Sequence, residues 1–188
     1  MSNINKLTKI AHLQGGLFTA LQAEGAGFNR TNYSYHTSNG NWFKEGWGLY
    51  SLPSIPKTEI SFYWKLYLWA RDKNDEPQAI ISHETALSFH ELSDANPSKV
   101  HFTVPKAFRK TAKIPKGLIL HKGNLEKKAI TTFSGLKLTT PIQTLADVHH
   151  EGSLSIDIIE QAVKEALKKG LVSKSELKQF PELLEHAI

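Results

Sequence analysis

The residues with the clearest chemical potential lie in a short polar segment that follows a glycine-rich turn. The segment reads Asn29-Arg30-Thr31-Asn32 and continues through Ser34-Tyr35-His36. Arginine can donate two hydrogen bonds to the edge of a guanine, asparagine can pair similarly with adenine, and hydroxyl groups can bind phosphates. At the start of a helix, these residue types are suited to reading base edges in the major groove of duplex DNA.

Three short helices are expected to position this segment. Apolar residues at helical spacing predict a first helix over residues 4–13. Thr19 is expected to cap a helix over residues 20–24, and Asn29 is expected to cap a further helix over residues 30–37. The two later helices, joined by the glycine-rich turn, have the arrangement of a helix-turn-helix.

A β-ribbon is expected to follow these helices. Residues 41–44 and 47–52 flank Glu45-Gly46, which suits a two-residue hairpin turn. This order predicts a winged helix-turn-helix over residues 1–55. In the alternative interpretation, Asn29 and Thr31 are only helix caps, and the winged helix is structural or binds protein. The residues expected to contact DNA are Thr19, Asn29, Arg30, Thr31, Asn32, Ser34, Tyr35, His36 and Lys44.

Residues 56–188 are expected to form a second, mixed α/β domain with a small sheet and C-terminal helices, which makes the chain an α+β protein. A helix rich in aromatic residues is expected over residues 59–71. If Phe62–Trp69 presented an exposed apolar face, the chain would instead be a protein-interaction scaffold. The expected strands cover residues 100–104, 118–121 and 129–133, and further helices are expected to begin near Ser82, Thr140, Ser155 and Ser173.

Positive charge is concentrated in the second domain. The formal net charge is +5, and the stretch from Lys99 to Lys128 contains a single acidic residue, Glu126. If its basic side chains share a face, they supply phosphate contacts that the weakly charged first domain lacks. A solvated surface is the alternative. The residues expected to make secondary phosphate contacts are Lys99, Lys106, Arg109, Lys110, Lys113 and Lys116.

The nine histidines suggest a metal site. However, His83 and His90 lie seven residues apart and His149-His150 are adjacent, and neither pair has the spacing of the HExxH zinc motif. These histidines are therefore interpreted as packing or surface residues. No metal and no other cofactor is expected.

Clustered carboxylates would favour a metal-dependent nuclease. Glu126 with Lys128 gives an acid-x-lysine pattern, and Asp94 precedes it, but Glu126 is expected in a polar turn. Ser82-His83 and Asp147 could be drawn as a catalytic triad, but Ser82 is interpreted as a helix cap. No catalytic residue is assigned, and a nuclease is kept as the alternative function.

The composition favours a reducing compartment. No cysteine is present, which excludes disulfides and Cys-ligated zinc fingers. The N-terminal residues show no apolar signal-peptide region. The longest apolar run, residues 62–70, is about half as long as a bilayer span and contains Lys65. A cytoplasmic protein without membrane contact is expected.

An ordered set of short motifs lies between Ile80 and Asp147. The blocks read IISHETALSFHEL, KVHFTVP, GLILHKGNL and GLKLTTPIQTLADV. They resemble the AbiEi-type antitoxins, transcriptional regulators of bacterial type IV toxin–antitoxin systems involved in abortive infection. In that family a winged helix is followed by a ShxSAL..hgL helix, a V.FTVP-like strand and a TP..TL.D helix. The matching positions are Ser82, His83, Thr85-Ala86-Leu87, His90-Glu91-Leu92, Val100–Pro105, Thr140-Pro141, Thr144-Leu145 and Asp147.

The resemblance implies a cytoplasmic repressor that binds inverted repeats in its own promoter. It also implies neutralisation of a nucleotidyltransferase-like toxin, without an obligatory stable complex. The ribbon over residues 39–47 is longer than the wings of that family, and the C-terminal antitoxicity region is shorter. We expect no enzymatic activity, and a monomer or a dimer that assembles on DNA.

Overall fold

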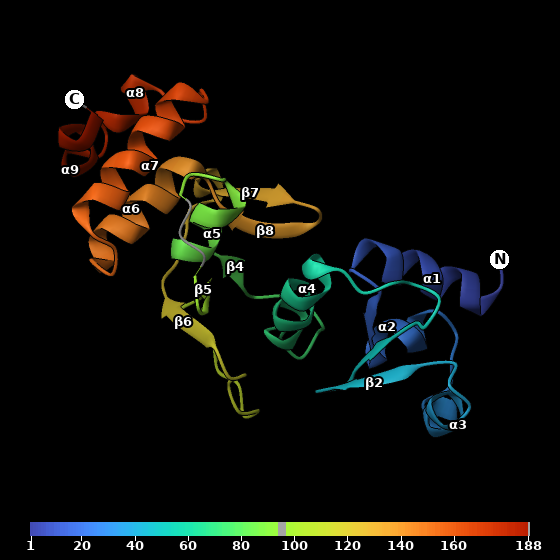
Figure 1. Ribbon diagram of the computed structural model, residues 1–188. Coiled ribbons are helices and arrows are strands. Elements are labelled where there is room, and N and C mark those ends of the chain that lie inside the picture. Colours follow the sequence, from blue (N-terminus) through green and yellow to red (C-terminus); the bar gives the residue numbers. More distant parts are fainter. Residues whose placement is uncertain (94–96, 188) are drawn as a thin grey trace. The chain divides into compact units, whose positions relative to one another are not determined.

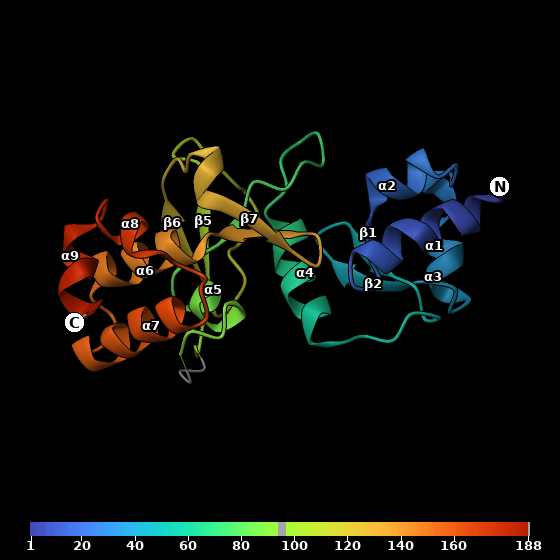
Figure 2. The same ribbon diagram turned by 90° about the horizontal axis from the view of Figure 1, so that it is seen from above.

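The computed structural model describes residues 1–93 and 97–187. Asp94, considered above for a nuclease site, lies outside these residues. Within them the expected α+β class is confirmed, with helices and two small sheets (Figures 1 and 2). The chain divides into two compact units. Met1–Gln78 and Lys110–Lys113 form the first, and the remaining described residues form the second.

The first unit extends beyond the boundary expected near residue 55. It includes α4 (Glu59–Trp69), because this helix contacts β1 and β3 of the same unit. Gly15, at φ +62°, lies so close to the helix that a Cβ atom there would be 2.9 Å from the Cα of Ser61. Of the aromatic side chains of α4, only Phe62 is largely exposed. The apolar face required by the scaffold alternative is therefore mostly buried.

The N-terminal part of the first unit contains short helices and one small sheet. Its strands are antiparallel and lie in the order β1-β3-β2. The sequence did not predict β1, because all three of its residues are buried and show no alternation. The elements are α1 (Asn3–Leu13), β1 (Leu17–Thr19), α2 (Ala20–Gly25), the 3-10 turn η1 (Arg30–Asn32), α3 (Tyr33–Ser38), β2 (Phe43–Gly46) and β3 (Leu49–Ser51).

The hairpin turn lies two residues later than expected. Glu45 and Gly46 belong to β2, and the turn is formed by Trp47 and Gly48, with φ angles of +54° and +71°. Two positive φ angles in succession are typical of the type I′ turns that match strand twist. The main-chain carbonyl of Trp47 accepts a hydrogen bond of 2.7 Å from Arg71 Nη2. The prediction was wrong because a tryptophan rarely adopts this backbone conformation.

Trp42 is the centre of the core of this part of the unit. It is 1% exposed, and its ring makes edge contacts with Phe18, Phe28 and Tyr33 at 5.0–5.1 Å between ring centroids. The ring also stacks on His36 at 4.5 Å. These contacts pack α3 against the sheet. They also keep the polar segment that precedes α3 at the surface.

The second unit combines a five-stranded mixed sheet with helices. The strand order is β6-β5-β4-β8-β7, in which β4 pairs with β8 and β5 pairs with β6 in parallel, while the other pairs are antiparallel. The elements are β4 (Ile80–Ile81), α5 (His83–Phe89), β5 (Val100–Val104), β6 (Leu118–Lys122), η2 (Lys127–Ala129), β7 (Ile130–Phe133), β8 (Leu136–Thr139), α6 (Pro141–Glu151), α7 (Ile156–Lys168), α8 (Lys174–Leu177), α9 (Pro181–Leu184) and η3 (Glu185–Ala187).

β5 occupies the interior of this sheet. All five of its residues are buried, including His101 and Thr103. The alternation that predicted the strand therefore does not separate a buried face from an exposed one, because β5 is covered on both faces. The helices α6 to α9 pack together (Figure 1), with Leu145 and Ile159 in their shared apolar core. Within residues 1–93 and 97–187, no helix is long and apolar enough to cross a membrane.

Candidate nucleic-acid interface

The polar segment predicted to read DNA lies at the surface of the first unit, on η1 and α3. Asn29 caps the 3-10 turn as expected, because its Oδ1 accepts hydrogen bonds from Thr31 N at 3.0 Å and from Thr31 Oγ1 at 2.9 Å. The segment is a 3-10 turn followed by a six-residue helix, and not the continuous helix expected. The exposed members are Asn29, Arg30, Thr31, Asn32, Ser34 and Tyr35, and His36 is half-buried against Trp42.

Arg30 is held loosely in this surface. Its Nε lies 2.6 Å from Glu24 Oε1, but the arginine side chain is 67% exposed. Exposed ion pairs of this kind contribute little to stability and exchange readily for other partners. The guanidinium is therefore available to an anion or to a base edge. Tyr35, 63% exposed, projects from the same segment.

Thr19 does not belong to this surface, although the sequence placed it there. The residue is fully buried, and its hydroxyl oxygen accepts a hydrogen bond from Gln22 N in a capping box at the start of α2. The same hydroxyl donates to Asp75 Oδ2. The cap predicted from the sequence is confirmed, but both roles leave Thr19 unavailable to DNA.

Lys44 is exposed on β2, beside a buried carboxylate that shapes the hairpin. Glu45 accepts hydrogen bonds from Ser51 Oγ at 2.8 Å, from Lys65 Nζ at 3.0 Å and from Lys57. Burial of Glu45 opposes its ionisation, but these three donors outweigh burial and lower its pKa from 4.5 to about 2. Glu45 thus offsets one of the two positive charges of Lys57 and Lys65. Lys44 is the exposed cation of β2.

The basic stretch does not form one common group. Lys110–Lys113 belong to the first unit and the rest of the stretch to the second. Lys110 donates a 2.6 Å hydrogen bond to the Arg71 carbonyl and lies 6.0 Å from the centroid of the Trp69 ring. Because its ammonium group is half-buried and already hydrogen-bonded, Lys110 is not an open phosphate ligand. Burial and the Arg71 charge also lower its pKa. Of the residues expected to make secondary phosphate contacts, the exposed ones are Lys99, Lys106, Arg109, Lys113 and Lys116.

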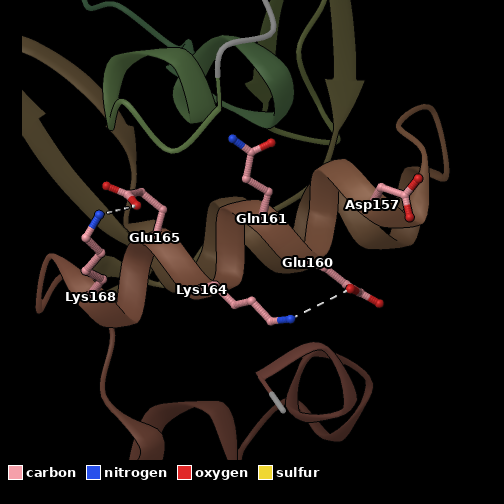
Figure 3. Close-up of a pocket in the computed structure, with 6 residues that line it drawn as sticks. All are labelled: Asp157, Glu160, Gln161, Lys164, Glu165 and Lys168. Atoms are coloured by element: carbon pink, nitrogen blue, oxygen red, sulfur yellow. Dashed lines mark hydrogen bonds and ion pairs between the residues drawn. The ribbon is translucent and has the colours of Figure 1, made fainter.

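A shallow depression along α7 gathers charged side chains of both signs, as Figure 3 shows. Lys164 Nζ lies 3.9 Å from Glu160 Oε2, and Lys168 Nζ lies 3.4 Å from Glu165 Oε2. All of the lining residues come from one helix and most of its charges pair with a neighbour. We therefore interpret this surface as a solvated helix face.

The second unit brings together histidines that the sequence did not connect. His83 opens α5, His101 lies in β5 and His121 in β6, and all three rings are near Glu151 at the end of α6. Burial, followed by the nearby His121 and His101, lowers the pKa of His83 to about 3. Burial also lowers the pKa of His121. The His83 ring is therefore neutral at physiological pH.

No local motif marks this cluster, because its members are separated by 18 to 30 residues. The sequence feature that could have pointed to the cluster is that His101 and His121 fall on two predicted strands. The pairs considered from sequence, His83 with His90 and His149 with His150, do not form it. Ser82 occupies the N-cap position of α5 but makes no side-chain capping bond, because its hydroxyl contacts His83 Nδ1 at 2.9 Å.

Two carboxylates of the nuclease and triad alternatives, Glu126 and Asp147, each pair with a residue close to them in the sequence. Glu126 is exposed and pairs with Lys128 at 3.0 Å. Asp147 accepts a 2.8 Å hydrogen bond from Gln143. The described residues thus define an α+β protein with an exposed polar helix in one unit and a histidine cluster in the other. The chain matches no family model and no curated protein.

Proposed function

We propose that this protein is a DNA-binding transcriptional repressor built on an N-terminal winged helix-turn-helix. The observation that carries the proposal is the exposure of Arg30, Asn32 and Tyr35 on η1 and α3, next to a three-stranded sheet. The element order helix, strand, helix, helix, strand, strand suits a winged helix. In such a module the third helix enters the major groove and the hairpin lies against the backbone.

We further propose that the repressor is the antitoxin of a type IV toxin–antitoxin operon and acts in the cytoplasm. This part rests on the resemblance of the motifs between Ile80 and Asp147 to AbiEi-type antitoxins. These motifs occupy the central sheet and the helices beside it in the second unit. On this proposal the second unit neutralises a nucleotidyltransferase-like toxin, and the first unit binds inverted repeats upstream of the operon.

Fluorescence anisotropy with a labelled duplex from the protein's own upstream region tests the DNA-binding proposal. Arg30→Ala or Asn32→Ala should each weaken specific binding by roughly 5- to 150-fold, the range for losing one base-reading side chain. Lys168→Ala is the matched control, because Lys168 is also an exposed residue in an ion pair. Binding unaffected by either interface substitution, or absent from the wild type, would refute the proposal.

A further inference from the structure

Four side chains converge within the second unit, each from a different element. His101 Nδ1 lies 3.0 Å from His121 Nε2. The two Glu151 carboxylate oxygens lie 3.8 Å from His121 Nε2 and 3.9 Å from His101 Nδ1. One ligand atom each of His83, His121 and Glu151 lies within 4.8 Å of the others. Nitrogen and carboxylate donors are therefore gathered in one place, with His83, His121 and Glu151 at its centre and His101 beside His121 and Glu151.

These distances fit a tetrahedral metal site. Zinc bonds to histidine nitrogen and carboxylate oxygen are about 2.0–2.2 Å long, which places the donors of a tetrahedron about 3.3–3.6 Å apart. The separations of 3.0, 3.8 and 3.9 Å lie on both sides of that range. To bind one ion, the side chains would have to shift and the nearly parallel rings of His83 and His121 would have to tilt toward each other.

We propose that His83, His121 and Glu151, with His101 completing the set, bind one divalent transition-metal ion, zinc being the natural occupant. Imidazole and carboxylate are common zinc ligands, and four of them without a thiolate suit a chain that contains no cysteine. The site is independent of the proposed DNA binding, because all four residues lie in the second unit.

Neighbouring hydroxyl groups bind the histidines, as the hydrogen-bond partners of metal ligands do. His83 Nδ1 contacts Ser82 Oγ at 2.9 Å, and that oxygen accepts a 2.8 Å hydrogen bond from Thr103 Oγ1. The main-chain nitrogen of His101 donates to Thr85 Oγ1 at 2.8 Å. With Nδ1 of His83 engaged, Nε2 is left as its ligand atom. A partner on the second ring nitrogen, as Ser82 is for His83, orients a ligating ring and sets its tautomer.

The placement of His83 has an energetic cost that a ligand role would explain. Its φ angle is +53°, in the left-handed region that is unfavourable for a residue with a Cβ atom. Its ring is stacked on that of His121 with 3.6 Å between centroids. The site also has access to solvent, because the side chains of His121 and Glu151 are 22% and 26% exposed. A metal ion could thus reach the cluster in the folded protein and tie together α5, β5, β6 and α6.

Metal binding to the full chain, purified without an affinity tag, tests the proposal. Equilibrium dialysis against Zn²⁺ should give one bound ion per chain, and Co²⁺ should show the visible absorption of a tetrahedral site. At Zn²⁺ concentrations about 100 times the dissociation constant, the melting temperature should rise by roughly 5–10 °C. Glu151→Gln and His121→Ala should each weaken binding by more than about 100-fold, because even outer partners of a ligand contribute 10- to 100-fold.

His12→Ala is the matched control, since His12 is an exposed histidine of the first unit. It should bind Zn²⁺ as the wild type does. Circular dichroism identifies any variant that fails to fold, and if His121→Ala is one, the isosteric Glu151→Gln decides the result. Absence of a bound ion in the wild type, or wild-type affinity in folded Glu151→Gln, would overturn the proposal.

Discussion

Glu45 gives the sharpest quantitative prediction, because one buried carboxylate holds the β2–β3 hairpin to two lysines. Its side chain is 9% exposed, and it accepts hydrogen bonds from Lys57, Ser51 and Lys65. The decrease of its pKa from 4.5 to about 2 corresponds to about 3 kcal/mol at 1.36 kcal/mol per pKa unit. Because Lys57 is exposed, solvent screens its charge and reduces this energy. We expect Glu45→Gln to lower the free energy of unfolding of the first unit by about 2–3 kcal/mol at pH 7.

The effect should depend on pH with a defined sign. Because folding lowers the pKa of Glu45, its stabilisation is fully present above about pH 4.5 and is lost as the pH falls toward 2. Wild type and Glu45→Gln should therefore differ most at neutral pH and converge in acid. A difference that persisted unchanged at pH 2 would indicate lost packing and not lost charge.

Urea unfolding followed by tryptophan fluorescence isolates the unit concerned. All four tryptophans, at positions 42, 47, 64 and 69, lie in the first unit. Glu24→Gln is the control, because it removes a carboxylate from the exposed pair with Arg30 and should cost less than about 1 kcal/mol. The reasoning fails if Glu45→Gln and Glu24→Gln have the same small effect at pH 7.

Two further predictions concern Asp147 and the basic stretch. Burial, the largest influence, raises the pKa of Asp147 from 3.8 to about 6, and its Oδ2 has no hydrogen-bond partner among the residues described. Asp147→Asn should raise the free energy of unfolding by about 1–3 kcal/mol at pH 8, measured by calorimetry, and the gain should vanish below pH 4. Lys106→Ala combined with Arg109→Ala should reduce the slope of log K against log salt for DNA binding by about 2, measured by anisotropy. Lys110→Ala should leave the slope unchanged, because this lysine already binds the Arg71 carbonyl.

The sequence predicted best those features that depend on neighbouring residues. The caps at Thr19 and Ser173 rest on hydrogen bonds between residues three apart, and both caps are confirmed. The strand at Val100–Val104 was found, but its complete burial was not, because that depends on what covers both faces. The two-residue strand Ile80–Ile81 is too short to show any pattern.

The histidine cluster could not be predicted for a different reason. Thr103 pairs with His121 across β5 and β6, which sets His121 beside His101, and this register arises only when the sheet is assembled. Glu151 joins them through the packing of α6, 30 residues further along the chain. Periodicity and motif spacing describe local structure, so they carry no information on which strands become neighbours.

The position of β4 in its sheet has a consequence for synthesis on the ribosome. Although β4 is the first strand of the second unit, Ile81 pairs with Phe102 on one side and with Leu138 on the other. The sheet can therefore close only after residue 138 has left the ribosome, whereas most of the first unit can fold some sixty residues earlier. During that interval the apolar strand β5 lacks its final covering, so chaperone binding to the nascent chain should concentrate there.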